Sequence, residues 1–124
     1  MAQDQTRPLR KVSGGRYRRY RTKRKYELGG FPAMTRLGER KIKMRRIVGG
    51  HYKPVLLSAK EVNVSDQKGK TQKTEILNVV ENPANPNLVR RNVITKGAVV
   101  ETKLGRVRVT SRPGQEGTVN GVLV

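Results

Sequence analysis

The stretch Lys11–Lys25 (KVSGGRYRRYRTKRK) restricts the possible folds of this chain more than any other feature. It contains eight Lys or Arg residues, two tyrosines and no acidic residue, and Val12 is its only aliphatic side chain. Such a stretch cannot bury enough apolar surface to offset the conformational entropy of ordering it, and its like charges repel one another. We therefore expect it to become ordered only against a polyanion, and nucleic acid is the first partner that this indicates.

The positive charge is concentrated in the first half of the chain. The formal net charge is +19, which exceeds what solubility requires and opposes a compact state unless an anionic surface compensates for it. Residues Met1–Lys53 hold 17 basic and 3 acidic side chains, whereas Pro54–Val124 hold 11 and 6. The first half is therefore expected to bind the partner, and the second half to form the folded anchor.

Several classes of protein are excluded by what the sequence lacks. The chain has no cysteine, which rules out disulfides and thiolate metal sites. Its N-terminal residues lack the apolar part of a secretory signal, and no run approaches the roughly 18 apolar residues of a membrane-spanning helix. The segment Arg10–Glu27 also lacks the apolar face that would hold an amphipathic helix on a membrane. We expect a cytoplasmic protein with no membrane partner, metal or cofactor.

Three short motifs do not carry the functions that they suggest elsewhere. Lys68-Gly69-Lys70-Thr71 resembles the end of a phosphate-binding loop, but Val64 stands where that loop requires glycine, and the flanking segments are typical of strands. His51 is the only histidine and has no carboxylate pair near it in the sequence, so no nucleophile–base pair or metal cluster is visible. Asn63-Val64-Ser65 matches a glycosylation acceptor by chance, because no secretory signal precedes it. We expect no enzyme activity and no small-molecule substrate.

From Leu37 onward, β-branched residues and turn signals alternate at short intervals, which predicts an all-β domain. The expected strands are Lys41–Val48, Pro54–Ala59, Lys60–Ser65, Thr74–Val80, Asn92–Thr95, Ala98–Thr102, Arg106–Ser111 and Thr118–Val124. One short helical turn is expected over Leu88–Arg91, capped by Asn87. Many short strands without a long helix indicate a small β-barrel of antiparallel strands, because closure removes exposed sheet edges. We therefore divide the chain into a long basic N-terminal extension, residues 1–36, and a β-barrel domain, residues 37–124.

Two of the expected strands show which way their side chains point. In Arg106–Ser111 the alternation places Val107 and Val109 toward the core and leaves basic side chains on the other face. In Lys41–Val48, Ile42 and Met44 alternate with cations in the same way, which predicts one apolar and one basic face. The barrel is therefore expected to carry basic surface of its own.

The residue types of the basic stretch favour RNA over duplex DNA. Arginine outnumbers lysine between Arg16 and Lys25, and its planar fork can bind a phosphate with two hydrogen bonds and stack on a base. Tyr17, Tyr20 and Tyr26 are interleaved with these cations, as is usual where proteins stack unpaired bases, although the tyrosines could instead pack on the barrel. No recognition helix for a major groove is visible. A chromatin-like architectural protein and an enzyme of nucleic-acid metabolism remain as alternative functions.

With these features in view, the chain resembles the eight-e family of small-subunit ribosomal proteins, which archaea and eukaryotes share. The resemblance is carried by Arg10–Gly15 (RKVSGG) with the basic run after it, by Asn78–Gly97 (NVVENPANPNLVRRNVITKG) and by Arg106–Gly117 (RVRVTSRPGQEG). The compact length resembles the archaeal members. The resemblance implies a β-barrel with an N-terminal extension that binds small-subunit ribosomal RNA (rRNA), next to other small-subunit ribosomal proteins. A related branch of the family acts in large-subunit biogenesis.

The resemblance marks the N-terminal signature and the basic run as rRNA contacts and adds Arg90 and Arg91, and the charge pattern adds other cations from Arg36 onward. The candidate rRNA-binding residues are Arg10, Lys11, Gly14, Gly15, Arg16, Tyr17, Arg18, Arg19, Tyr20, Arg21, Lys23, Arg24, Lys25, Arg36, Arg40, Lys41, Lys43, Arg45, Arg90, Arg91, Arg106, Arg108 and Arg112. On this reading the protein is a non-catalytic component of the ribosome, in the cytoplasm.

Overall fold

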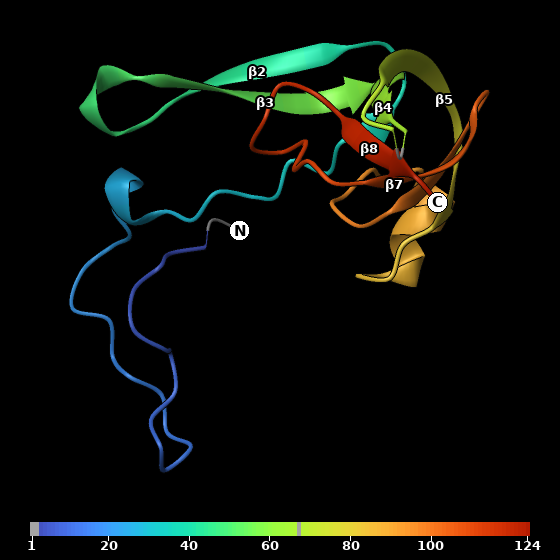
Figure 1. Cartoon of the computed structure of the whole chain (residues 1–124). Coiled ribbons are helices and arrows are strands. Elements are labelled where there is room, and N and C mark those ends of the chain that lie inside the picture. Colours follow the sequence, from blue (N-terminus) through green and yellow to red (C-terminus); the bar gives the residue numbers. More distant parts are fainter. Residues whose placement is uncertain (1–2, 67) are drawn as a thin grey trace. The chain divides into compact units, whose positions relative to one another are not determined.

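The computed structural model describes residues 3–66 and 68–124, and the chain divides into two compact units (Figure 1). Unit 1 is Met1–Pro32 and unit 2 is Ala33–Val124. Within the part of the chain that the structure describes, no helix is long and apolar enough to cross a membrane.

Unit 1 is held by backbone hydrogen bonds and has no core. The Gln5 amide donates to the Glu27 carbonyl at 2.9 Å, so the first residues of the unit run beside the short 3₁₀ turn η1 (Lys25–Glu27). A tight turn follows, in which the Lys11 amide donates to the Gly15 carbonyl at 2.7 Å. None of residues 3–32 is buried. The unit therefore lacks the apolar packing that provides most of the stability of an ordinary domain.

In its described residues, 33–66 and 68–124, unit 2 has eight strands and two 3₁₀ turns (Figure 1). In chain order they are β1 (Arg36–Leu37), β2 (Lys41–Arg46), η2 (Val48–Gly50), β3 (Tyr52–Ala59), β4 (Glu61–Ser65), β5 (Thr71–Glu81), η3 (Pro86–Arg91), β6 (Val99–Thr102), β7 (Gly105–Val109) and β8 (Asn120–Leu123). Strands β4 to β8 form a closed barrel in the order β4-β5-β6-β7-β8, and β1-β3-β2 form a separate three-stranded sheet. The all-β barrel predicted from the sequence is confirmed.

The barrel closes through one parallel pair, although antiparallel strands were expected throughout. β4 and β8 run parallel, with Asn63 opposite Asn120, and the other four pairs of the barrel are antiparallel. The reason is geometric: strand directions cannot alternate all the way around a ring with an odd number of strands. A five-stranded barrel must contain at least one parallel pair.

Small β-branched residues fill the core of unit 2, as their strand alternation requires. In β4, Val62 and Val64 are buried while the residues between and beside them are not, and in β7 the same is true of Val107 and Val109. The end of β3 joins the barrel core through a buried Leu56. The inward direction predicted for Val107 and Val109 is thus confirmed.

Two local predictions in the segment after β5 were wrong. Asn92–Thr95 is not a strand: Asn92 has a left-handed backbone (φ +49°) that ends η3, and Val93 makes only an isolated bridge to Arg36. The cap of η3 is Asn85 rather than Asn87, since the Asn85 side chain accepts a hydrogen bond from the Asn87 amide at 3.0 Å. Asparagine is common both at the N-cap of a helix and in the left-handed position that ends one. The sequence alone does not say which asparagine takes which position.

The ribbon formed by β2 and β3 also differs from the expectation. The pattern of Ile42 and Met44 predicted a strand with one apolar and one basic face, but all six residues of β2 are exposed, the apolar ones included. Within unit 2, the far end of this ribbon extends beyond the barrel strands (Figure 1). β2 is an edge strand, and its alternating cations are a common means of preventing edge-to-edge pairing.

Candidate nucleic-acid interface

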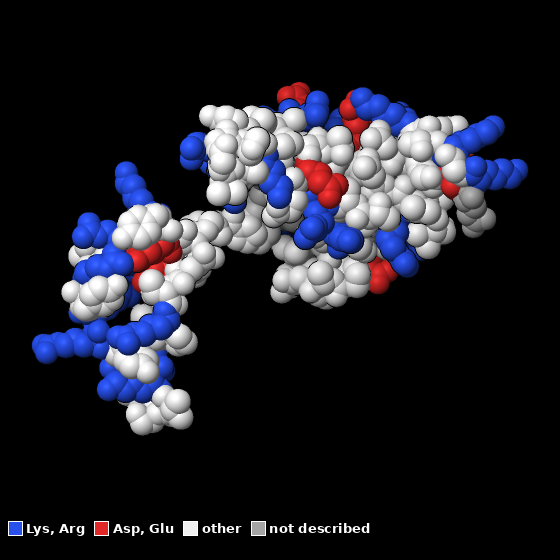
Figure 2. Space-filling view, turned by 60° about the vertical axis from the view of Figure 1, so that its left-hand side comes forward, with Lys and Arg blue, Asp and Glu red and all other residues white. Residues whose placement is uncertain are grey.

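The candidate residues of unit 1 are almost all at the surface. Arg21 and Lys23 are half-buried, and the other candidates between Arg10 and Lys25 are exposed. In Figure 2, blue Lys and Arg side chains are spread over the visible face of the smaller unit, among white and a few red ones. A surface of this kind can meet phosphates without first being uncovered.

Two acidic residues partly neutralise unit 1 from within. Residues 1–32 contain ten Lys or Arg and only Asp4 and Glu27 as acids. Asp4 lies 3.7 Å from the ammonium of Lys23, and Glu27 forms an ion pair with Arg21. Partial desolvation opposes ionisation of Asp4, but hydrogen bonds from its own backbone and from Thr6, with nearby cations, lower its pKa below the ordinary value. Both acids therefore hold cations in place, and most of the positive charge remains for a partner.

The three tyrosines of unit 1 lie in different surroundings. The guanidinium of Arg7 lies 4.1 Å from the centroid of the Tyr17 ring, and the ammonium of Lys11 lies 5.6 Å from it. Tyr17 is 37% exposed, whereas Tyr20 and Tyr26 are each 81% exposed. Two cations therefore pack against the Tyr17 ring. The Arg21 guanidinium lies 5.1 Å from the centroid of the Tyr20 ring, but Tyr20 and Tyr26 remain mostly open to solvent.

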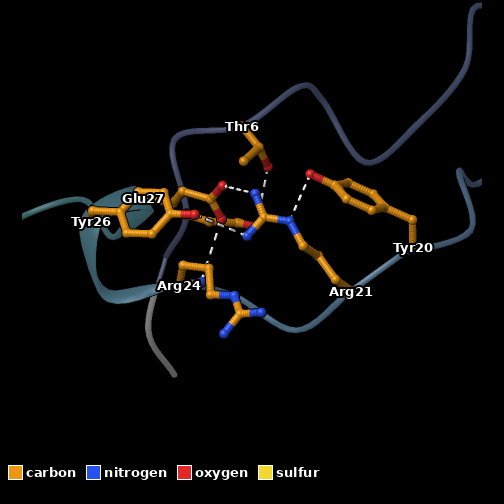
Figure 3. Close-up of polar contacts among 7 residues, drawn as sticks. Thr6, Tyr20, Arg21, Arg24, Tyr26 and Glu27 are labelled. Atoms are coloured by element: carbon orange, nitrogen blue, oxygen red, sulfur yellow. Dashed lines mark hydrogen bonds and ion pairs between the residues drawn. The ribbon is translucent and has the colours of Figure 1, made fainter.

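Arg21 connects the two open tyrosines to Glu27 (Figure 3). Its Nε donates to the Tyr20 hydroxyl at 2.8 Å, its Nη1 donates to the Tyr26 hydroxyl at 3.4 Å, and its Nη2 donates to the Glu27 carboxylate. The hydrogen bond to Tyr20, supported by those to Glu27 and Tyr26, raises the pKa of Arg21 above its ordinary value despite partial desolvation. Arg21 is therefore permanently charged and occupied by partners within its own unit.

Cations face each other in one isolated β-bridge and in the β2–β3 pair. Arg10 and Arg16 form an antiparallel bridge in unit 1, and Arg45 of β2 lies opposite Lys53 of β3 in unit 2. Like charges directly opposite one another destabilise a pair of strands, and an anion between them would remove that cost. Lys53 was missed by the sequence analysis, because its pairing with Arg45 depends on the register of the ribbon.

The remaining candidates of unit 2 are exposed but dispersed. Arg106 and Arg108 point outward from β7, as predicted, and Glu101 of β6 lies opposite Arg106. Arg90 and Arg91 occupy the last turn of η3. In Figure 2, blue side chains on the larger unit are scattered among red and white ones. On the face that Figure 2 shows, unit 2 thus offers separate cationic points rather than one dense field.

The motifs that could have indicated an enzyme have structural roles. Lys68-Gly69-Lys70 lies in the turn between antiparallel strands β4 and β5, and not between a strand and a helix, and Thr71 begins β5. Gly69 has φ +79° there, and its amide donates to the Asp66 carbonyl at 3.0 Å. Residue Gln67 of this turn lies outside the described residues. Among residues 3–66 and 68–124, no group of three His, Cys, Asp or Glu side chains could hold a metal ion.

Fold and surface together define a small basic β-barrel protein with exposed cations and tyrosines suited to an anionic polymer. The model of the family "Ribosomal protein S8e" matches residues 4–124, and the chain belongs to this family. Membership of this non-enzymatic family of ribosomal structural proteins also excludes a role as an enzyme.

Three archaeal relatives are similar over nearly their whole length, and each is called "Small ribosomal subunit protein eS8". The relative from Nanoarchaeum equitans is 51% identical over 97% of this chain and 95% of its own length. That from Methanobrevibacter smithii is 50% identical over 100% of both chains, and that from Methanocorpusculum labreanum is 48% identical over 97% of both. The resemblance identified from the sequence is confirmed.

Proposed function

We propose that this chain is a structural constituent of the small ribosomal subunit, and that it binds and stabilises small-subunit rRNA. The family and the names of its archaeal relatives support the ribosomal role and a place in the cytoplasm. One observation carries the rRNA-binding part: residues 3–32 hold most of the cations of the first half of the chain and bury none of their side chains. A segment with this surface gains its order from a partner with dense negative charge.

The proposed interface has two parts, a basic extension over residues 1–36 and the barrel domain over residues 37–124. In the extension, arginine forks bind phosphates and the tyrosines meet bases. Arg36, the last residue of the extension, also meets phosphate. In the barrel domain, phosphates meet Arg40, Lys41, Lys43, Arg45, Arg90, Arg91, Arg106, Arg108 and Arg112. Neighbouring small-subunit ribosomal proteins cover part of the remaining surface.

The proposed mechanism is electrostatic. RNA helices repel one another through their phosphates, and a cationic segment between them reduces this repulsion so that they can pack. The pairs Arg10–Arg16 and Arg45–Lys53 fit this mechanism, because a phosphate bound between two facing cations relieves their mutual repulsion as well.

Binding to a small-subunit rRNA fragment and to duplex DNA of equal length tests the proposal. If six to ten cations reach phosphates, affinity for rRNA should fall about 10³- to 10⁵-fold between 50 and 200 mM salt. At about 150 mM salt, rRNA should bind more tightly than duplex DNA, because it offers clefts and unpaired bases. Equal or tighter binding of duplex DNA would favour the architectural-protein alternative.

Sedimentation of cell extracts provides an independent test. We expect the protein in mature small ribosomal subunits. Recovery only from precursors of the large subunit would contradict the proposal and indicate the biogenesis branch of the family.

A further inference from the structure

From the geometry around Arg21 we propose that Tyr20 and Tyr26 form a preorganised pair of stacking surfaces for unpaired nucleobases. The inference rests on the proposed RNA-binding function and makes it specific: two of the three tyrosines of unit 1 receive bases, and Arg21 positions them.

The first step concerns where the two rings point. Figure 3 shows Tyr20 and Tyr26 on opposite sides of Arg21, with both hydroxyls directed toward its guanidinium. The hydrogen bonds are made at the hydroxyl ends of the rings, with donor–acceptor distances of 2.8 Å and 3.4 Å. The guanidinium also lies 5.1 Å from the centroid of the Tyr20 ring, so it covers at most one face of that ring. The 81% exposure of each tyrosine agrees with this.

The second step concerns why such rings would be held in place. An exposed aromatic side chain on a flexible segment loses rotamer freedom when a base stacks on it, and this loss reduces affinity. Arg21 makes three of its donors available to two hydroxyls and to Glu27, so one residue restrains both rings. Lysine could not replace it, since an ammonium lacks the planar fork.

The third step distinguishes these tyrosines from Tyr17. Two cations already lie against the Tyr17 ring, and its hydroxyl is not one of those bonded to Arg21. A base would have to displace Arg7 or Lys11 to reach that ring. Tyr17 therefore orders the neighbouring backbone, while Tyr20 and Tyr26 present open faces among cations that attract the sugar-phosphate chain.

Tyrosine fluorescence of the wild-type chain tests the inference without any substitution. The chain has four tyrosines and no tryptophan, so its emission reports on tyrosines directly. We expect an unstructured oligoadenylate RNA to quench this emission through stacking, and inorganic polyphosphate of the same charge, which has no bases, to bind without comparable quenching. Equal signals from both polymers would overturn the inference.

Substitution then identifies the rings. The double variant Tyr20→Leu/Tyr26→Leu should bind oligoadenylate about 5- to 100-fold more weakly, as expected for the loss of one to two stacked bases, with its polyphosphate affinity within about 2-fold of wild type. The matched control is Tyr52→Leu, which removes a 63% exposed tyrosine of unit 2. An equal loss for both polymers, or no loss for either, would contradict base stacking at these positions.

The variant Arg21→Lys tests the positioning role because it keeps the charge. It should reduce oligoadenylate affinity and quenching by a larger factor than it changes polyphosphate affinity, because the charge is kept and the hydrogen-bonding fork is lost. If the double variant Tyr20→Leu/Tyr26→Leu and the variant Arg21→Lys both bind a small-subunit rRNA fragment as wild type does, the stacking inference fails and the rRNA-binding proposal stands. If the wild-type chain does not bind that rRNA fragment more tightly than duplex DNA of equal length, the rRNA-binding proposal itself fails.

Discussion

Gly121 of β8 lies directly against Val107 of β7. A Cβ atom at position 121 would stand 2.4 Å from Cγ1 of Val107 and 2.8 Å from the carbonyl oxygen of Arg108. Both atoms belong to the strand that Gly121 pairs with, so neither can move away without opening the barrel. Gly121 also faces Val64 across the parallel β4–β8 pair, which places it at the closure of the barrel.

The variant Gly121→Ala should therefore be destabilised by about 1–3 kcal/mol, as is usual when a methyl group is forced into a packed core. The melting temperature should fall by roughly 4–8 °C for each kcal/mol in a domain of this size. The control is Gly114→Ala, whose new Cβ would make an ordinary contact of 3.5 Å with Ala33. Equal melting temperatures for the two variants would show that β7 and β8 do not approach this closely.

The hydroxyl of Thr35 fixes the chain at the start of unit 2. Thr35 is 3% exposed, and its Oγ1 donates to the Leu56 carbonyl at 2.7 Å. Replacing it with valine keeps the shape but removes the donor, which should lower the free energy of unfolding by about 1 kcal/mol. Thr110→Val removes an exposed hydroxyl bonded at 3.3 Å and should change stability by less than about 0.5 kcal/mol. Urea unfolding measures both, and a smaller effect at Thr35 than at Thr110 would be inconsistent with the buried bond.

The β2–β3 ribbon should tolerate polar substitution where the barrel does not. Met44 of β2 is 58% exposed, so Met44→Ser is expected to change the free energy of unfolding by less than about 0.5 kcal/mol. Val64 of β4 is fully buried, and Val64→Ala should lower the free energy of unfolding by about 2 kcal/mol because of the cavity that remains. A large loss at Met44 would mean that the ribbon is covered within the free protein.

The acid sensitivity of unit 2 should depend in part on Glu75. Its carboxylate lies 3.0 Å from the ammonium of Lys103 and 3.1 Å from that of Lys60. The hydrogen bonds from Lys103 and Lys60 lower the pKa of Glu75 below its ordinary value of 4.5. A pKa that is lower in the folded state stabilises the fold above the unfolded value, and this stabilisation is lost as pH falls through the folded pKa.

Glu75→Gln should therefore have a slightly lower melting temperature than wild type at pH 7, and the difference should disappear as the pH falls from 4.5. The effect is small because the pair is exposed to solvent. Glu116→Gln, in the loop before β8, serves as the control. A difference that stays constant down to acidic pH would argue against the ion pairs.

Charge removal in the basic stretch should separate binding from folding. Arg18 and Arg19 are exposed, so Arg18→Gln/Arg19→Gln should reduce the slope of log affinity for rRNA against log salt by roughly 1.4 to 1.8. The melting temperature of unit 2 should be unchanged. Lys68→Gln/Lys96→Gln removes the same charge from turns of unit 2, outside the proposed interface, and should leave the slope nearly as in wild type. A fall in melting temperature for the arginine variant would show that the stretch is part of the folded core.

The sequence by itself determined the class of fold and the kind of partner. Alternation of valines with cations in Arg106–Ser111 is a local property, and it correctly gave the buried face of β7. The charge of Lys11–Lys25 is equally local, since no way of folding removes the repulsion of so many neighbouring cations. Both properties can be read without knowing which residues meet in space.

Only the tertiary structure decided how the barrel closes and which apolar and aromatic side chains are exposed. The parallel β4–β8 pair follows from the number of strands in the ring, which no single segment reveals. The exposure of Met44 depends on the absence of a second layer over β2, although its pattern matches that of a buried strand. Likewise Tyr17 and Tyr20 stand in similar sequence surroundings, but Arg7 and Lys11 pack against Tyr17, whereas Arg21 beside Tyr20 leaves that side chain 81% exposed. Strand pairing and side-chain packing join residues that are far apart in the sequence. A local sequence pattern therefore does not determine them, and this is why the tertiary structure was needed.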